Sequence, residues 1–159
     1  MITIRKAVVD DLDAIMLVQS AVYTAEYVED VEVFRAIVDH GTSFVAVDSL
    51  GAVIGYLLCH ASVRDVIYAL NLVPDMTDGG WMFIHDLSIL PGYRRNNAAS
   101  NMLVILEESF RQIQGIQLIA VNGAESFWKR VGFVKRPRLQ ITTTASYGGS
   151  CVFMEKRWE

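Results

Sequence analysis

The stretch WMFIHDLSILPGYRRNNAASNML, residues 81–103, places a strand, a turn and the start of a helix in immediate succession. Residues 81–90 are largely apolar on both faces, which is typical of a central strand in a sheet. The turn that follows carries two arginines and two asparagines, and from residue 99 apolar residues recur at helical spacing up to Ile113. The turn is either an ordinary strand–helix connection with solvated arginines or an anion cradle, because a helix N-terminus presents unpaired N–H groups and partial positive charge.

The segments on either side predict further strands and helices of one sheet-containing domain. Before this stretch we expect strands over 3–9, 43–47 and 52–61 and helices over 12–23 and 30–39. Asp10 and Asp11 are the expected cap and first-turn acids of the first helix, and Gly41 is the expected stop of the second. After it we expect a strand over 116–121, a short helix over 124–131 and two final strands around SYGG, residues 146–149. Residues 74–80 have the composition of a loop. The fold class is therefore α/β (α+β), in one domain over 1–159.

Composition narrows the functional class. The chain has 159 residues, 52% of them apolar, and a net charge of −4. These values are typical of a globular protein and disfavour a general nucleic-acid binder, which is usually basic. No apolar run approaches the ~20 residues of a membrane span, and the start lacks a signal-peptide core. Cys59 and Cys151 are isolated, so we expect a reducing, cytoplasmic location and no metal.

Four segments resemble the GNAT superfamily of N-acetyltransferases, in the right order along the chain. RRNNAA, residues 94–99, resembles the family's acyl-CoA loop, Q/R-x-x-G-x-G/A, and DLSILPGYR, residues 86–94, resembles the strand that leads into it. VNGAESFWKRVGF, residues 121–133, resembles the later N-x-x-A-x-x-F-Y-x-x-x-G-F signature, and residues 2–15 resemble the usual opening strand and helix. The resemblance implies a mixed, mostly antiparallel central sheet flanked by helices.

The resemblance also implies a site for acetyl-CoA. In this family the pantetheine arm pairs with the splayed end of the fourth strand, and the diphosphate lies on the loop. The implied cofactor-binding residues are Leu87, Ser88, Ile89, Arg94, Arg95, Asn96, Asn97, Ala98, Ala99, Ser100, Asn122 and Trp128. The Leu87 backbone N–H is the expected donor to the thioester oxygen.

Two departures from the family pattern bear on catalysis. Asn97 stands at a position where glycine is commonest, although asparagine is the non-glycine residue most at ease with a positive φ. Trp128 stands where the family usually has the tyrosine proposed to protonate the leaving thiolate, and an indole N–H is no practical acid. Three alternatives follow: water protonates the thiolate, another group such as Tyr93 or Tyr147 substitutes for the tyrosine, or the protein binds the cofactor without useful turnover.

Candidates for proton transfer and acceptor binding lie on the strand and near the first helices. His85 is two residues before Leu87, so period-two alternation places both on one face, and an imidazole suits a general base at neutral pH. The alternative is a histidine satisfied within the sheet. Asp86 then points the other way and braces backbone or a neighbouring helix. The acidic run EYVEDVE, residues 26–32, places Glu26, Tyr27 and Glu29 as acceptor-binding candidates or as a solvated loop.

The predicted function is transfer of an acetyl group from acetyl-CoA to a small-molecule or peptide amine by direct attack. The alternative is an acyl-CoA-binding sensor or regulatory module with little turnover, which Asn97 and Trp128 favour. We expect neither a nucleic-acid nor a membrane partner, and the apolar content is compatible with a homodimer.

Overall fold

The fold is taken from a computed structural model, which describes residues 1–121, 123–136 and 151–158. These residues form a seven-stranded sheet in the order β1-β2-β3-β4-β5-β7-β6, in which only β4 and β5 pair in parallel. The strands are β1 (Thr3–Lys6), β2 (Phe44–Val47), β3 (Val53–Ser62), β4 (Trp81–Ile89), β5 (Gly115–Ala120), β6 (Val134–Lys135) and β7 (Val152–Arg157). The predicted mixed, mostly antiparallel sheet is thus confirmed, with β4 at its centre.

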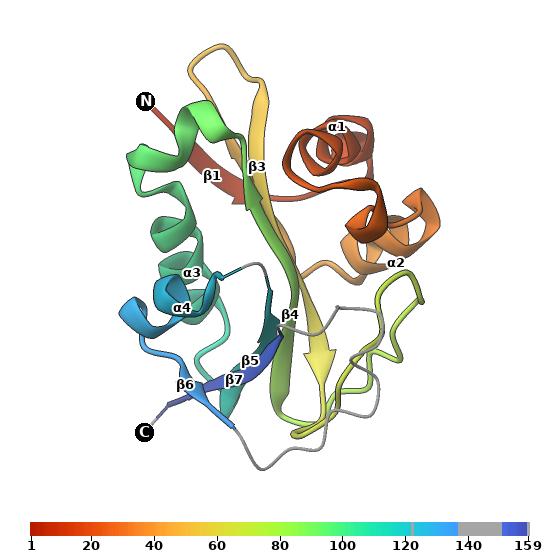
Figure 1. The fold of residues 1–159 in the computed structure, drawn as a ribbon, viewed down its shortest axis with the longest axis vertical. Helices are drawn as coiled ribbons and strands as arrows, with labels where there is room; N and C mark the ends of the chain where they lie inside the picture. Colours follow the sequence, from red (N-terminus) through yellow and green to blue (C-terminus); the bar gives the residue numbers. More distant parts are fainter. Residues whose placement is uncertain (122, 137–150, 159) are drawn as a thin grey trace.

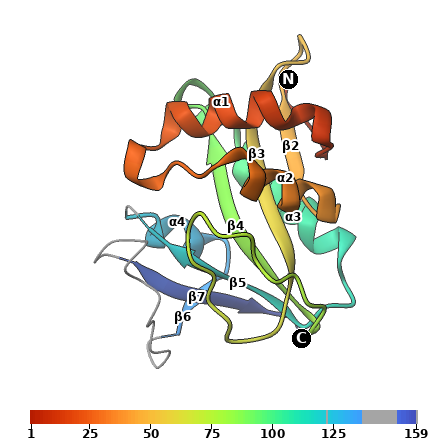
Figure 2. The same cartoon turned by 90° about the vertical axis from the view of Figure 1, so that its right-hand side faces the viewer.

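Helices cover both faces of this sheet. Figures 1 and 2 show α1 (Leu12–Val22) and α2 (Val31–His40) on one face and α3 (Ala98–Ser109) and α4 (Glu125–Arg130) on the other. Three 3₁₀ turns, Val9–Asp11, Ala25–Tyr27 and Pro91–Asn96, precede α1, α2 and α3. Among the described residues, no helix combines the length and the apolar character that crossing a membrane requires.

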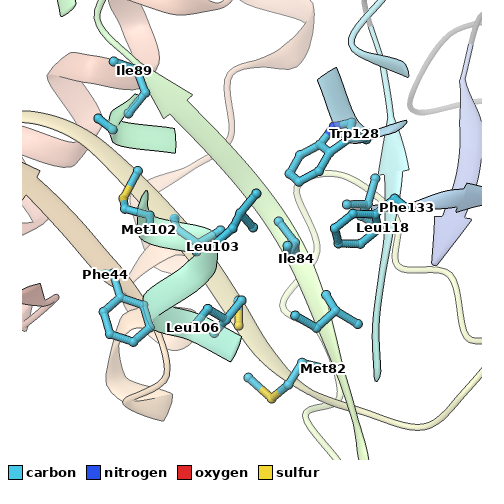
Figure 3. Packing of buried hydrophobic residues seen from close by; sticks show 14 of the residues in the cluster. Phe44, Met82, Ile84, Ile89, Met102, Leu103, Leu106, Leu118, Trp128 and Phe133 are labelled. Atoms are coloured by element: carbon cyan, nitrogen blue, oxygen red, sulfur yellow. The ribbon is translucent and has the colours of Figure 1, made fainter. Parts of the chain in front are cut away.

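Each face has its own apolar core. The α3 side buries Met102, Leu103 and Leu106 against β-strand residues such as Ile84 and Leu118. Figure 3 shows this packing, with Trp128 and Phe133 beside Leu118. The α1–α2 side buries Ile15, Phe34 and Ile37 against Tyr56 and Leu58 of β3. Because a buried side chain of this size contributes about 1.5–3 kcal/mol, the two layers fix the helices on the sheet.

Some boundaries differ from the prediction. β1 ends at Lys6 rather than at Val9, because residues 9–11 form a 3₁₀ turn. Asp11 does occupy the N-cap position of α1, but its carboxylate pairs with Arg5 and accepts the Val8 N–H instead of capping the helix. The predicted stop at Gly41 is confirmed by its left-handed φ of 87°. The SYGG turn lies outside the described residues.

A bulge in β4 determines which way its side chains face. Leu58 pairs with Asp86 and the next residue, Cys59, pairs with Ile84, so His85 is an extra residue in the ladder. A bulge reverses the alternation of side chains beyond it. Ile84 packs in the α3-side core before the bulge, and Leu87 packs against the same core after it.

β4 and β5 separate just beyond this bulge. Their pairing runs from Trp81 with Gly115 to Ile84 with Leu118, although both strands continue further. Figure 3 shows the two strands running apart beyond Ile84, with Trp128 at the level of the gap. Among the described residues, the end of β4 therefore has a free edge on the side of β5, which is the splay that the sequence resemblance implied.

Candidate functional site

A cavity of about 530 Å³ lies where β4 and β5 diverge. Its wall includes every residue of β4 from Ile84 to Ile89 and the start of α3 at Ala99. The far ends are formed by α4 on one side and by Tyr23, Tyr27 and Leu70 on the other. The cavity is thus continuous from the N-terminus of α3 to the segment after α1, which gives room for two reactants.

The N-terminus of α3 forms one end of this site. Asn97 adopts the left-handed conformation, with φ 57° and ψ 19°, as its sequence position predicted. The Asn97 side chain makes no capping hydrogen bond to the helix, and the first helical bond runs from the Asn101 N–H to the Asn97 carbonyl. The N–H groups of the first turn are therefore available to an anion.

The predicted cofactor residues divide into those that line the cavity and those that do not. Arg94 lines it and donates from Nε to the Ile89 carbonyl at 3.2 Å, so its guanidinium is held between β4 and α3. Leu87, Ser88, Ile89, Ala99 and Trp128 line the cavity as well. Arg95, Asn96 and Asn97 are exposed beside it, Ala98 is buried under the helix, and Ser100 is half-buried. Asn122 lies outside the described residues.

The free edge of β4 presents backbone donors to the cavity. The Leu90 N–H donates to the Ile54 carbonyl on the β3 side. Because successive N–H groups of a strand point to opposite edges, those of Ile89 and Leu87 are directed to the edge that β5 leaves unpaired. This orientation fits the expected role of the Leu87 N–H as a donor to a thioester oxygen.

His85 is buried on the α1–α2 side of the sheet. Its side chain has no exposed surface, and its ring lies edge-on to Phe34 of α2. Nε2 lies 2.9 Å from both carboxylate oxygens of Glu29, and buried Nδ1 has no partner among the described residues. The expectation that His85 shares a face with Leu87 is wrong, because the bulge at His85 turns Leu87 toward α3.

Glu29 is a buried partner of His85 rather than an exposed acid. It is 3% exposed, and its carboxylate also accepts the Asn71 N–H at 2.6 Å. Its backbone is fixed by two hydrogen bonds with the Gln19 side chain. Both carboxylate oxygens are therefore occupied. Glu26 is exposed and accepts from the Thr24 hydroxyl, outside the cavity, whereas Tyr27 lines it.

Asp86 is surrounded by hydroxyl donors. Its carboxylate accepts the Tyr23 hydroxyl at 2.6 Å and the Tyr56 hydroxyl at 2.5 Å, and Ser88 contributes a longer bond of 3.3 Å. Burial raises the pKa of Asp86, and the two phenol donors oppose that shift. Burial and the Asp86 charge raise the pKa of both tyrosines, so they remain donors.

Asp86 braces the end of α1 through Tyr23, as predicted. It faces away from Leu87, as predicted, but it lies on the same side as His85, which the alternation did not predict. Tyr56, which holds Asp86, packs against Phe34, the same ring that contacts His85. Asp86 and His85 therefore face the same side of the sheet. No local sequence pattern predicts this cluster, because its members lie up to 63 positions apart.

The candidates for the acid that protonates the leaving thiolate lie in different places. Trp128 lines the cavity but packs edge-on against Phe127 and Phe133 in the core. Tyr93 donates to Asp48 at 3.4 Å and is not part of the cavity wall. Tyr147 lies outside the described residues. Among the residues described, no three His, Cys, Asp or Glu side chains gather as metal ligands.

A splayed strand pair, an uncapped helix N-terminus and a cavity joining them define the class of an acyl-CoA-dependent transferase fold. The model of the acetyltransferase (GNAT) family matches residues 9–133, so the chain belongs to that family. None of the curated protein sequences matched the chain.

Solved structures share this fold over nearly the full chain at low sequence identity. PaiA N-acetyltransferase from Thermoplasma acidophilum, in complex with coenzyme A, is 18% identical with a TM-score of 0.71, covering 99% of both chains. Ard1 from Thermoplasma volcanium is 15% identical with a TM-score of 0.75, covering 99% of this chain and 98% of that one. The GNAT-like decarboxylase GphF, in complex with isobutyryl-CoA, is 14% identical with a TM-score of 0.78, covering 98% of each.

Proposed function

We propose that this protein transfers an acetyl group from acetyl-CoA to the nitrogen of a primary amine, by direct attack within a ternary complex. The observation that carries the proposal is the cavity at the β4–β5 divergence. It runs from Arg94 and the start of α3, where we place the diphosphate, to a polar end around Asp86. Coenzyme A in the PaiA and GphF structures supports an acyl-CoA in the same fold.

Different groups along the cavity have different roles in the proposed reaction. Arg94 and the first N–H groups of α3 hold the diphosphate through charge-assisted bonds. The unpaired edge of β4 orients the pantetheine arm, and the Leu87 N–H stabilises the oxyanion that forms as the amine attacks. His85 stays a predicted general base, and its burial against Glu29 makes the partly exposed Asp86 a second candidate.

Turnover across a panel of acceptors tests this proposal. The panel contains 1,4-diaminobutane, benzylamine, peptides with a free N-terminus and a peptide with an internal lysine, with CoA release and acetylated product both measured. Because a relative is a decarboxylase, malonyl-CoA is included to detect acetyl-CoA formation without an amine. Acetylated amine from at least one class is the expected result.

Binding is tested separately so that it can be distinguished from turnover. A ligand at 100 times its dissociation constant stabilises a fold by about 2.7 kcal/mol, so acetyl-CoA should raise the Tm by several degrees. Arg94→Gln should weaken this shift. Arg35→Gln, an equal charge change at an exposed position on α2, should not. A thermal shift without any turnover favours the sensor alternative, and no shift at millimolar acetyl-CoA contradicts both.

A further inference from the structure

We propose that Asp86, held by Tyr23 and Tyr56, binds the ammonium group of the acceptor and takes its proton. The inference rests on the proposed function and names the catalytic group within it. Asp86 is a half-buried residue of the cavity wall, directly before Leu87, whose N–H faces the unpaired edge of β4. A group at this position is adjacent to the site where the thioester carbon must lie.

Burial and hydrogen bonding separate Asp86 from the two other candidates. His85 has no exposed side-chain surface, and Nε2 is taken by Glu29. Glu29 is itself buried, with one carboxylate oxygen shared between His85 and the Asn71 N–H. A base must come within hydrogen-bond reach of the proton that it removes. All three residues line the cavity, but His85 and Glu29 are buried whereas Asp86 is only half-buried.

The surroundings of Asp86 suit a cation. The two phenols and Ser88 donate three hydrogen bonds to the carboxylate and leave about one acceptor position, on Oδ2, since an ionised carboxylate accepts about four hydrogen bonds. Tyr23 and Tyr27 bring aromatic rings to the same end of the cavity, with centroids 6.2 Å apart. A carboxylate beside aromatic rings is a common environment for an ammonium group. Burial also raises the pKa of Asp86, which strengthens it as a base.

The proton balance of the reaction closes with these groups. The ammonium nitrogen has three protons and the amide product has one. The first proton passes to the Asp86 carboxylate and from there to solvent, and the free amine forms the C–N bond to the thioester carbon. The C–S bond then breaks with its electron pair on sulfur. The nitrogen loses its second proton, and the thiolate gains a proton, either this one by direct transfer or one from solvent.

Asp86→Asn is the direct test, because it keeps the shape of the side chain and removes the basic oxygen. We expect kcat/KM for the best primary amine of the panel to fall by about 10²–10⁴-fold, the usual contribution of a general base. The deficit should be much smaller for the O-alkylhydroxylamine analogue of that amine, which is neutral at the assay pH and needs no base before attack. An unchanged thermal shift with CoA confirms that the variant folds and binds cofactor.

Tyr56→Phe tests the same assignment through pH. Tyr56 is fully buried and touches no substrate, but its hydroxyl lowers the pKa of Asp86. Removing it should move the rising limb of kcat/KM to higher pH. The titratable groups facing Asp86 are Tyr23, Tyr56, His85 and Glu29, so His85→Gln is measured alongside. Tyr68→Phe, a buried tyrosine bonded to Ser62 outside the cavity wall, is the matched control and should leave the limb in place.

Three results would overturn the assignment. The first is Asp86→Asn with kcat/KM within tenfold of the wild type. The second is an equal loss for the alkylamine and its neutral analogue, and the third is a rising limb that disappears in His85→Gln but not in Asp86→Asn. Absence of amine acetylation by the wild-type protein would instead refute the proposed function itself, so the two failures are distinguishable.

Discussion

Asn97 is a point where a single residue determines the geometry of the expected cofactor loop. Its φ of 57° and ψ of 19° place it in the left-handed region, immediately before the first turn of α3. A residue with a Cβ loses about 1–2 kcal/mol there, and asparagine is one of the few that tolerates it. Asn97→Ala should therefore cost about 1 kcal/mol of folding free energy, which for a chain of this size lowers the Tm by about 2–4 °C.

The neighbouring residue gives a matched control. Asn96 is also exposed, but it ends the preceding 3₁₀ turn and does not have a positive φ. Asn96→Ala should change the free energy of unfolding by no more than about 0.5 kcal/mol, as for most surface substitutions. Asn97→Gly should be close to neutral, because relief of the left-handed strain offsets the greater freedom of glycine in the unfolded chain.

Thermal unfolding of the four proteins, with and without CoA, is the assay. If the left-handed turn aims the α3 N-terminus at the diphosphate, Asn97→Ala should lose part of the CoA-induced shift and Asn97→Gly should keep it. Equal stability and equal CoA response in Asn97→Ala and Asn96→Ala would refute this reasoning. A clear gain in CoA affinity for Asn97→Gly would show that the natural asparagine strains the site.

Three further predictions concern the leaving group, acid stability and the acidic segment. Trp128→Tyr should change kcat by less than about threefold, since a thiolate with a pKa near ~8.5 needs little acid assistance, and a rise of tenfold or more would show that the missing acid limits the rate. Arg5 lowers the pKa of Asp11, so the pair stabilises the fold above the ordinary Asp pKa and loses this effect as pH falls through the lower pKa of the folded state. Arg5→Ala should therefore narrow the gap between the Tm values at pH 7 and pH 3. For cationic acceptors, kcat/KM should fall with ionic strength because Glu26 and its exposed acidic neighbours steer charge, and an equal response from neutral acceptors would exclude steering.

The order of strands and helices was predictable from the sequence because each element has a local signal. The two-sided apolar pattern of residues 81–90 predicts the central strand that β4 is, and Gly41 ends α2 in the left-handed conformation that glycine allows. The turn at Asn97 was predictable for the same reason, since asparagine tolerates a positive φ. These features depend on neighbours within a few residues.

The chemistry of the site was not predictable in this way, because it depends on one inserted residue and on distant pairings. Alternation along residues 85–87 predicts His85 beside Leu87, and nothing in those three residues signals a bulge. The bulge is defined by the register with β3, which advances by one residue between Leu58 and Cys59. The pairing of Glu29 with His85 likewise spans 56 positions and depends on how α1 and α2 pack on the sheet.

The bulge explains how one strand can serve two reactants. An unbroken β4 would alternate strictly, so consecutive polar residues would lie on opposite faces of the sheet. With His85 inserted, His85 and Asp86 both face the α1–α2 side, while Leu87 and Ile89 pack toward α3. The polar groups then lie on the side where we propose that the acceptor binds, and the apolar side chains lie on the side of the expected cofactor loop. Between them the free edge of β4 presents the Leu87 N–H to the cavity, where the amine and the thioester would have to meet.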